Sequence, residues 1–270
     1  MFYKKYYCII LLYNMSSKFV VILLLILVIL VTLVIIYQNN KEPFVNNMKI
    51  DKIYVINLKK NTDRLEKFME DAKKANVTVE RFDAIYGKEL QKDHPDIVKY
   101  FVKDHKLNPG QIGCALSHIK VWQDAIDNNY NNILVFEDDA IIPENFWNKF
   151  NDAYEELPKD YDMLLIGCCT CTGNTINKTK LIKANSIGNW CTAGYLININ
   201  YCKKIMERII KNEINESIDN FLRKNYHKDN IYIALPPFII QDKTMESDIT
   251  MGDLGNTLQI DKNKPVTWGT

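Results

Sequence analysis

Three consecutive segments near residue 50 restrict the chain to a small group of folds. The segment "KIYVINL" (52–58) is apolar and β-branched, as in a buried strand, and residues 62–77 then place apolar side chains at helical spacing. The segment "TVERFDAIYG" (78–87) returns to a strand pattern. A strand, a helix and a strand in this order open a parallel sheet, so the sequence predicts an α/β domain.

The same alternation continues along the chain. Apolar residues at helical spacing predict helices over residues 107–129 and 201–210. Short apolar runs predict strands at residues 132–136, 161–169, 188–200 and 229–241, the last of them interrupted by Pro236 and Pro237. No internal repeat is present. One α/β domain with a mostly parallel central sheet, covering residues 49–270, accounts for this pattern.

The N-terminal region has a different character. No charged residue occurs between Phe19 and Asn40. Residues 19–37 would form about 28 Å of helix at ~1.5 Å per residue, which is enough to cross the core of a bilayer. No pair of small residues follows this segment as a cleavage site would require, so we expect an uncleaved anchor rather than a signal peptide.

The charges around this segment predict its orientation. Lys4, Lys5 and Lys18 precede it without any acidic residue, which favours a cytoplasmic N-terminus. We therefore expect a single-pass type II membrane protein whose main domain lies on the lumenal or exoplasmic side. Its parts would be a cytoplasmic N-terminus (1–18), an anchor (19–37), a polar stem (38–48) and the main domain (49–270).

Charge and cysteine content exclude some classes of function. The formal net charge is +1, and no stripe of Lys and Arg alternates with aromatic residues, so we expect no nucleic-acid partner. Of seven cysteines, Cys8 precedes the anchor and six follow it, which permits disulfides in an oxidising compartment. The run "CCTC" (168–171) has no second CxxC or HxxxH at the spacing of zinc ligands. We expect a loop disulfide or buried thiols there.

Three acids follow directly after one of the predicted buried strands. In "NNILVFEDDAIIPENF" (131–146), the strand runs into Glu137, Asp138 and Asp139. Ligands of open α/β sheets bind beyond the carboxyl ends of the strands. Adjacent carboxylates repel one another, and they need a cation, basic partners or open water. Mg²⁺ or Mn²⁺ suits such hard oxygen ligands, and a solvated turn without a ligand is the alternative.

Six ordered blocks make the chain resemble glycosyltransferase family 25, the group of lipooligosaccharide and procollagen galactosyltransferases. The blocks are "IYVINLKKNTDRLEKF" (53–68), "VERFDAIYG" (79–87), "GQIGCALSHIKVWQDAI" (110–126), "ILVFEDDAII" (133–142), "AGYLIN" (193–198) and "QDKTMESDI" (241–249). The resemblance implies a GT-A type fold, a UDP-sugar donor, usually UDP-galactose, and a divalent metal on an acidic motif. The acceptor would be a glycan or a protein hydroxyl. A non-catalytic, membrane-anchored recognition module of the same fold is the alternative.

The resemblance also implies roles for individual residues. Asp139 would ligate the metal with help from Glu137, and Asp138 would lie at the donor. The remaining donor-site residues would be Asn57, Asp63, Arg64 and His118, and the start of the helix near Asp63 is suited to a pyrophosphate. On the residues alone, His118 is expected to be a packed residue with satisfied ring nitrogens rather than a catalyst.

The catalytic base is the least constrained assignment. If the reaction inverts the anomeric carbon, as a β-linked product requires, one carboxylate must deprotonate the acceptor hydroxyl. Asp219 is the first candidate and Asp248 the second. Tyr195 offers a ring on which a sugar could stack, but a strand aromatic is as readily part of the core.

Overall fold

The computed structural model describes residues 19, 21–32, 49–168, 171, 173–176, 179–188 and 191–245. The chain divides into two compact units, Met1–Met48 and Lys49–Thr270. In the first unit, residues 19 and 21–32 are helical, and residues 20 and 33–37 of the predicted anchor lie outside the described residues. Within the described part, no helix is both long and apolar enough to cross a membrane.

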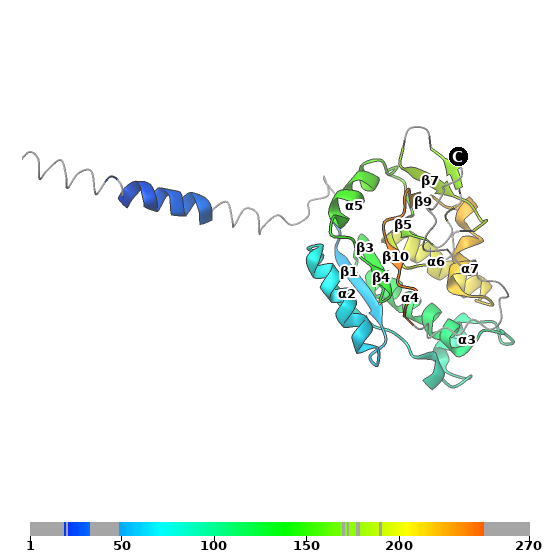
Figure 1. The fold of residues 1–270 in the computed structure, drawn as a ribbon. Helices are drawn as coiled ribbons and strands as arrows, with labels where there is room; N and C mark the ends of the chain where they lie inside the picture. The colour runs from blue at the N-terminus through cyan, green and yellow to red at the C-terminus, as the bar shows by residue number, and fades with distance from the viewer. Residues whose placement is uncertain are drawn as a thin grey trace, which may run out of the picture. The chain divides into compact units, whose positions relative to one another are not determined.

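The second unit is built on an eight-stranded sheet (Figure 1). Its strands, in spatial order, are β2 (Glu80–Asp83), β1 (Lys52–Asn57), β3 (Asn132–Glu137), β8 (Gly194–Asn198), β5 (Met163–Gly167), β9 (Ile231–Ala234), β7 (Leu181–Ala184) and β6 (Gly173–Thr175). Strands β8 and β7 run against the other six. A short ladder of β4 (Ala140–Ile141) and β10 (Ile240–Gln241) lies outside this sheet.

Helices cover both faces of the sheet (Figure 1). Two of them, α2 (Thr62–Lys74) and α5 (Phe146–Glu155), lie on one side, and α4 (Pro109–Asp127) packs with α6 (Ile199–Asn212) on the other. Two short helices, α3 (Pro95–Tyr100) and α7 (Ile218–Arg223), join the α4 side, and single 3-10 turns span Gly87–Glu89 and Tyr226–Lys228.

Strand β3 shows how the two faces are sorted. Alternate side chains of a strand point to opposite faces. Ile133 and Val135 belong to the core shared with α4 and α6. Phe136 instead packs against Phe68 of α2 and Phe146 of α5, with ring centroids 5.7 and 5.8 Å apart. The strand is buried on both faces, which explains its continuous apolar run.

Helix α4 has the strongest local signals for its start. Asn108 caps it by accepting a hydrogen bond from the backbone N–H of Gln111 at 2.9 Å, and the Gln111 side chain accepts from the Asn108 N–H at 3.0 Å. This reciprocal pair is a capping box, and Pro109 occupies the first helical position. The helix is therefore held at its N-terminus, next to the edge of the sheet where the acids lie.

The structure confirms most of the predicted elements and adds others. The predicted strands and helices of residues 52–74, 107–137 and 199–212 are present, and the predicted domain has the α/β class. Helices α3 and α5 and the β6–β7 hairpin were not predicted. Cys168 and Cys171 form a disulfide, and Cys202 is a buried thiol, so both predicted states of the cysteines occur.

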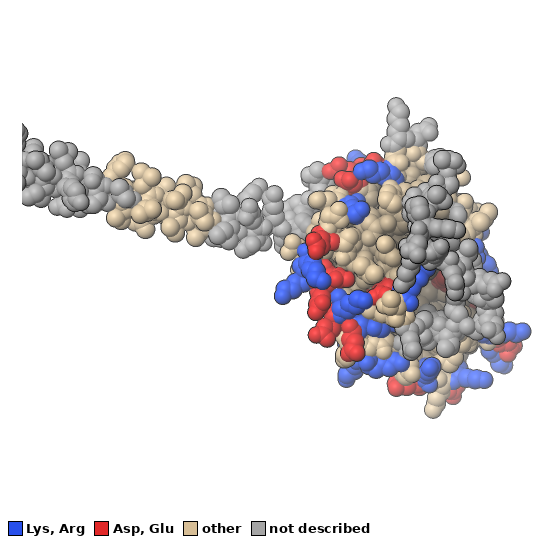
Figure 2. All heavy atoms as spheres, viewed as in Figure 1, with Lys and Arg blue, Asp and Glu red and all other residues tan. Residues whose placement is uncertain are grey.

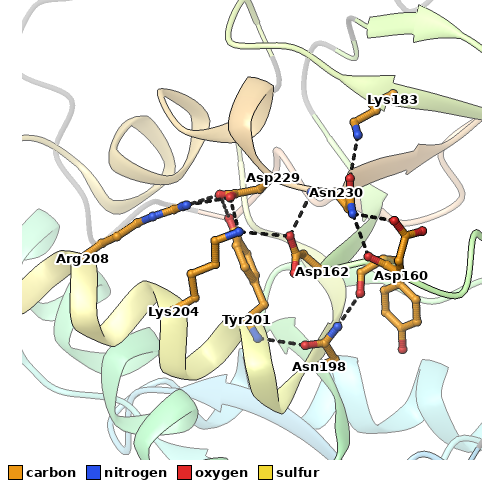
Figure 3. A network of polar contacts seen from close by, with 10 residues as sticks. Asp160, Asp162, Lys183, Asn198, Tyr201, Lys204, Arg208, Asp229 and Asn230 are labelled. Atoms are coloured by element: carbon orange, nitrogen blue, oxygen red, sulfur yellow. Dashed lines mark hydrogen bonds and ion pairs between the residues drawn. The ribbon is translucent and has the colours of Figure 1, made fainter.

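A buried polar network fixes α6 to the end of the sheet (Figure 3). The Asp229 side chain is fully buried and accepts hydrogen bonds from Arg208 and from the Tyr201 hydroxyl, the latter at 3.0 Å. Lys204 Nζ lies 2.7 Å from Asp229 Oδ1. Arg208 and Lys204 thus compensate the buried carboxylate, whose pKa is lowered because these hydrogen bonds outweigh its burial.

On the face shown in Figure 2, Lys and Arg side chains are interspersed with Asp and Glu. Exposed pairs such as Lys74 and Asp71, 3.2 Å apart, contribute about 1 kcal/mol at most to stability. The apolar layers, rather than surface charge, hold the domain together.

Candidate active site

The three acids at the end of β3 diverge: Glu137 is the last residue of the strand, and Asp138 and Asp139 form the turn that follows it. Glu137 follows Ile133 and Val135 toward α4, and it meets His118 of that helix. Asp138 follows Phe136 toward α2, and it pairs with Arg64 of that helix. Each carboxylate therefore has its own surroundings.

Asp138 is bound on both of its oxygens. Oδ2 accepts a hydrogen bond from Asn57 Nδ2 at 2.7 Å, and Oδ1 forms an ion pair with Arg64. Asn57 is itself buried and accepts at Oδ1 from Arg81 Nε at 2.9 Å. Burial raises the pKa of Asp138, although Arg64 and Asn57 oppose this. Asp138 and Asn57 thus tie the adjacent ends of β1 and β3 together and hold Arg64 in place.

Glu137 is held by a chain of buried donors. His118 Nε2 lies 3.2 Å from Glu137 Oε1, which also accepts from the Thr192 hydroxyl. His118 Nδ1 lies 2.8 Å from Tyr195 Oη, and that oxygen accepts from Trp122 Nε1 at 3.1 Å. Because a carboxylate only accepts, we assign the imidazole proton to Nε2. The Tyr195 hydroxyl then donates to Nδ1, and the chain of donors is complete.

This chain has an electrostatic consequence for Glu137. Burial raises its pKa, but the hydrogen bonds from His118 and Thr192 and the nearby charge of Arg64 outweigh it, and the pKa lies below its usual value. Both contacts reach Oε1. The lowered pKa keeps the Glu137 carboxylate ionised. Among the described side chains, none hydrogen-bonds its other oxygen, which is therefore open to a ligand.

Asp139 has the least compensation of the three acids. Its Oδ1 is buried and has no hydrogen-bond partner among the described residues, and Oδ2 lies 3.6 Å from Arg64 Nη2. Burial and the charge of Glu137 raise its pKa to about 7. A buried carboxylate oxygen without a donor is costly. A cation at this oxygen would remove the cost, so the residues fit a divalent ion with oxygen ligands.

The acids open into a cavity of about 110 Å³ at the carboxyl ends of β1 and β3. Of the predicted site residues, the cavity is lined by Arg64, His118, Glu137, Asp138 and Asp139. Asn57 is buried behind it, where it acts on Asp138. Asp63 is exposed at the start of α2 and is not among the lining residues.

One wall of the cavity is the segment after β2. It packs so closely on α4 that a Cβ on Gly87 would lie 1.8 Å from the Pro109 carbonyl oxygen. A Cβ on Gly113 would lie 2.4 Å from the Ile85 carbonyl oxygen. The Ser117 hydroxyl accepts from the Ile85 N–H at 2.8 Å, which fixes the wall further. Tyr86 and Lys88 then line the cavity from this side.

The segment after β10 reaches the acids from another direction. The Asp242 N–H donates to the Asp139 carbonyl oxygen at 2.7 Å, and the Asp242 side chain pairs with Lys67. The start of the sixth sequence block is therefore placed beside the acidic triplet. Asp248 lies outside the described residues, so its predicted role stays a prediction.

Asp219 lies in the first turn of α7 and is half-buried. Burial raises the pKa of the Cys114 thiol, and the charges of Glu137, Asp219 and Asp139 add to this. Asp219 is not among the lining residues of the cavity. Tyr195 is fully buried and belongs to the core, so its ring offers no surface to a sugar.

Two residues of the candidate site were not predicted from the sequence. Thr192 lies inside the predicted strand of residues 188–200 and carried no signal of its own. Cys114 lines the cavity, and with His118 and Glu137 it forms a group whose ligating atoms lie within 4.8 Å of one another and could hold a metal ion. The spacing of Cys114 and His118, four residues apart on a predicted helix, was a readable signal for this group.

The family model and the sequence relatives agree on one family. The model of "Glycosyltransferase family 25 (LPS biosynthesis protein)" matches residues 50–222. A Haemophilus influenzae protein named as a glycosyltransferase is 30% identical over 217 residues, which cover 72% of this chain and 72% of that protein. Procollagen galactosyltransferase 2 of Mus musculus is 26% identical over 175 residues, 59% of this chain but only 28% of that protein. A solved glycosyltransferase involved in glycosylating the major capsid of PBCV-1 is 9% identical, with a TM-score of 0.42 and coverage of 73% of this chain and 94% of that one.

Proposed function

Because the chain belongs to glycosyltransferase family 25, we propose that it transfers a hexose from a UDP-sugar to a hydroxyl group of a glycan or a protein. That it is a glycosyltransferase follows from the family. Galactose is the proposed sugar because a procollagen galactosyltransferase is among its relatives. One observation carries the proposal: Asp139 Oδ1 is buried without a donor beside the ionised Glu137, in a cavity at the sheet edge.

Asp139 and Glu137 are the proposed ligands of a Mn²⁺ or Mg²⁺ ion. Asp139 offers the buried Oδ1, and Glu137 offers the oxygen that His118 and Thr192 leave unused. When bound, such an ion supplies Lewis-acid stabilisation to the diphosphate of the departing nucleotide. Both carboxylate oxygens of Asp138 are already bonded, one to Arg64 and the other to Asn57, which supports a structural role for the middle acid.

Arg64 is the proposed contact to the donor phosphates. It lines the cavity while its guanidinium pairs with Asp138 and approaches Asp139. A guanidinium presents several donors in a fixed plane, so one edge can hold a carboxylate while another meets a phosphate. The Asp138 pair therefore orients Arg64 before any substrate arrives.

Asp219 is the proposed general base of an inverting transfer. It would take the proton from the acceptor hydroxyl as that oxygen attacks the anomeric carbon. Its position at the start of α7, a helix that contacts α4, supports an approach from the α4 side of the cavity. This side is opposite to α2, which carries Arg64.

We further propose that residues 19–37 anchor the protein in a membrane, with residues 49–270 on the lumenal or exoplasmic side. The uncharged stretch and the lysines before it support this. Protease digestion of sealed vesicles should leave residues 49–270 intact. Recovery of the full chain in the soluble fraction, or digestion of these residues from the cytoplasmic side, would contradict the anchor.

The proposed activity is tested by incubating the purified protein with a panel of UDP-sugars and acceptors, with Mn²⁺ or with EDTA. We expect release of UDP and a β-linked product from UDP-galactose in Mn²⁺ only. Turnover that persists in EDTA would refute the role of the metal, and an α-linked product would refute inversion. If no UDP-sugar is consumed, the protein is better described as a non-catalytic recognition module of the same fold.

A further inference from the structure

Three side chains of different chemistry converge on the α4 side of the cavity. Cys114 and His118 are four residues apart on α4 and therefore share one face of the helix. Glu137 reaches the same place from the end of β3. Their ligating atoms all lie within 4.8 Å of one another, and all three residues line the cavity.

The chemistry of this group differs from that of the oxygen ligands proposed for Mn²⁺ or Mg²⁺. A thiolate, an imidazole and a carboxylate are the donors that Zn²⁺ takes in proteins, whereas hard cations prefer oxygen alone. Three protein ligands and one position open to the cavity match the arrangement of exchangeable rather than closed zinc sites. The free thiol of Cys114 is available, because Cys114 forms no disulfide.

We propose that Cys114, His118 and Glu137 form a second cation site, specific for thiophilic divalent ions such as Zn²⁺. On binding, the thiol releases its proton to solvent and the sulfur becomes a ligand. His118 binds through Nε2, so its ring proton moves to Nδ1, where the Tyr195 hydroxyl oxygen accepts it. The Tyr195 hydroxyl oxygen already accepts a hydrogen bond from Trp122 Nε1. The hydroxyl proton of Tyr195, which was donated to His118 Nδ1, then has no acceptor among the described residues. This cost makes the zinc reversible rather than a permanent structural ion.

The two proposed cation sites share the Glu137 carboxylate. A zinc ion on Glu137 withdraws that carboxylate from the ion proposed at Asp139. Zinc therefore inhibits sugar transfer without resembling either substrate. The inhibition rests on the proposed function, whereas the binding of zinc does not.

Titration of the full chain with Co²⁺, a spectroscopic substitute for Zn²⁺, tests the site directly. A thiolate bound to Co²⁺ gives a charge-transfer absorption band in the near ultraviolet. We expect this band in the wild type and its loss on addition of Zn²⁺. Cys114→Ser should lack the band, whereas the matched variants Cys202→Ser and Cys8→Ser should keep it. Absence of the band in the folded wild type, or its presence in Cys114→Ser, would overturn the proposal.

A second measurement needs no variant. Zn²⁺ should protect the Cys114 thiol of the wild-type chain from alkylation by iodoacetamide, as read by peptide mass spectrometry. An unchanged alkylation rate at Cys114 would refute the site. Transfer assays in Mn²⁺, with and without Zn²⁺, separate the two proposals. A cobalt band without any transfer activity would support the zinc site and refute the proposed function. Transfer that Zn²⁺ does not slow, with the band present, would refute the shared role of Glu137.

Discussion

His118 Nε2 lies 3.2 Å from Glu137 Oε1, and this contact joins the middle of α4 to the end of β3. The other ring nitrogen of His118 is held by the Tyr195 hydroxyl, so a core tyrosine sets the direction of a cavity carboxylate. Outer groups of this kind orient metal ligands in many proteins. They are positioning residues, and their effect should appear in metal binding.

Tyr195→Phe tests this chain of contacts. The change removes the hydroxyl that fixes His118, so Glu137 loses its orientation. We expect the Mn²⁺ concentration for half-maximal transfer to rise about 10- to 100-fold. The kcat at saturating Mn²⁺ should be largely retained. Tyr154→Phe, at a ring that stacks on Phe150 away from these contacts, serves as the control. An unchanged Mn²⁺ requirement with reduced kcat would refute positioning by Tyr195.

Asp139→Asn should stabilise the metal-free protein at high pH. The native pKa of Asp139 is raised to about 7, so the native state retains a proton that the unfolded chain releases at about pH 4. The retained proton contributes on the order of a few kcal/mol to the free energy of unfolding at low pH. This contribution is lost as the pH rises through about 7. The variant avoids that loss.

Denaturant unfolding in EDTA at about pH 5 and about pH 8 measures the effect as a difference between variant and wild type. The variant should gain relative stability at the higher pH. Asp63→Asn, at an exposed position, should follow the wild type at both values. A variant that is less stable than the wild type at the higher pH would show that Asp139 is a structural carboxylate instead.

Asp219→Asn should abolish transfer while leaving donor binding intact. Removal of a positioned general base typically costs ~10²- to 10⁴-fold in rate. Mn²⁺-dependent affinity for UDP, measured by calorimetry, should survive because the donor contacts lie elsewhere. Glu207→Gln, exposed on α6, is the matched control. Near-normal transfer by Asp219→Asn would move the assignment to Asp248 or to another acid.

Asp229→Asn should destabilise the domain without a specific effect on the site. The change leaves Arg208 and Lys204 without their buried anion, and breaking such a pair costs roughly 3–5 kcal/mol. Because the native pKa of Asp229 is lowered, the wild-type advantage should shrink as pH falls below about 4. Thermal unfolding across pH measures both effects. An unchanged Tm at neutral pH would contradict the importance of this network.

The hydrophobic pattern was sufficient to predict the strands and helices that form the site. Residues 52–58 and 132–136 read as buried strands, and parallel neighbours bring Asn57 and the acids to one edge. The direction of Glu137 toward α4 follows from alternation along β3, of which it is the last residue. The helix α5 also carried a signal, since Phe146 and Phe150 stand at helical spacing.

Other features depend on contacts that no local pattern encodes. The reversed direction of β8 follows from how the chain crosses the sheet, and an apolar run such as "GYLIN" reads the same in either direction. The ion pair between Arg64 and Asp138 depends on the distance between α2 and β3, which a local sequence pattern does not give. The position of Asp219 similarly depends on where α7 packs.

Calorimetric titration of Mn²⁺ in the presence of UDP shows whether Asp139 and Glu137 hold a divalent cation for the donor. The wild-type chain should bind one Mn²⁺ ion, and Asp139→Asn should show no binding at concentrations that saturate the wild type. Equal Mn²⁺ affinity in the wild type and in Asp139→Asn would contradict the proposed cation site.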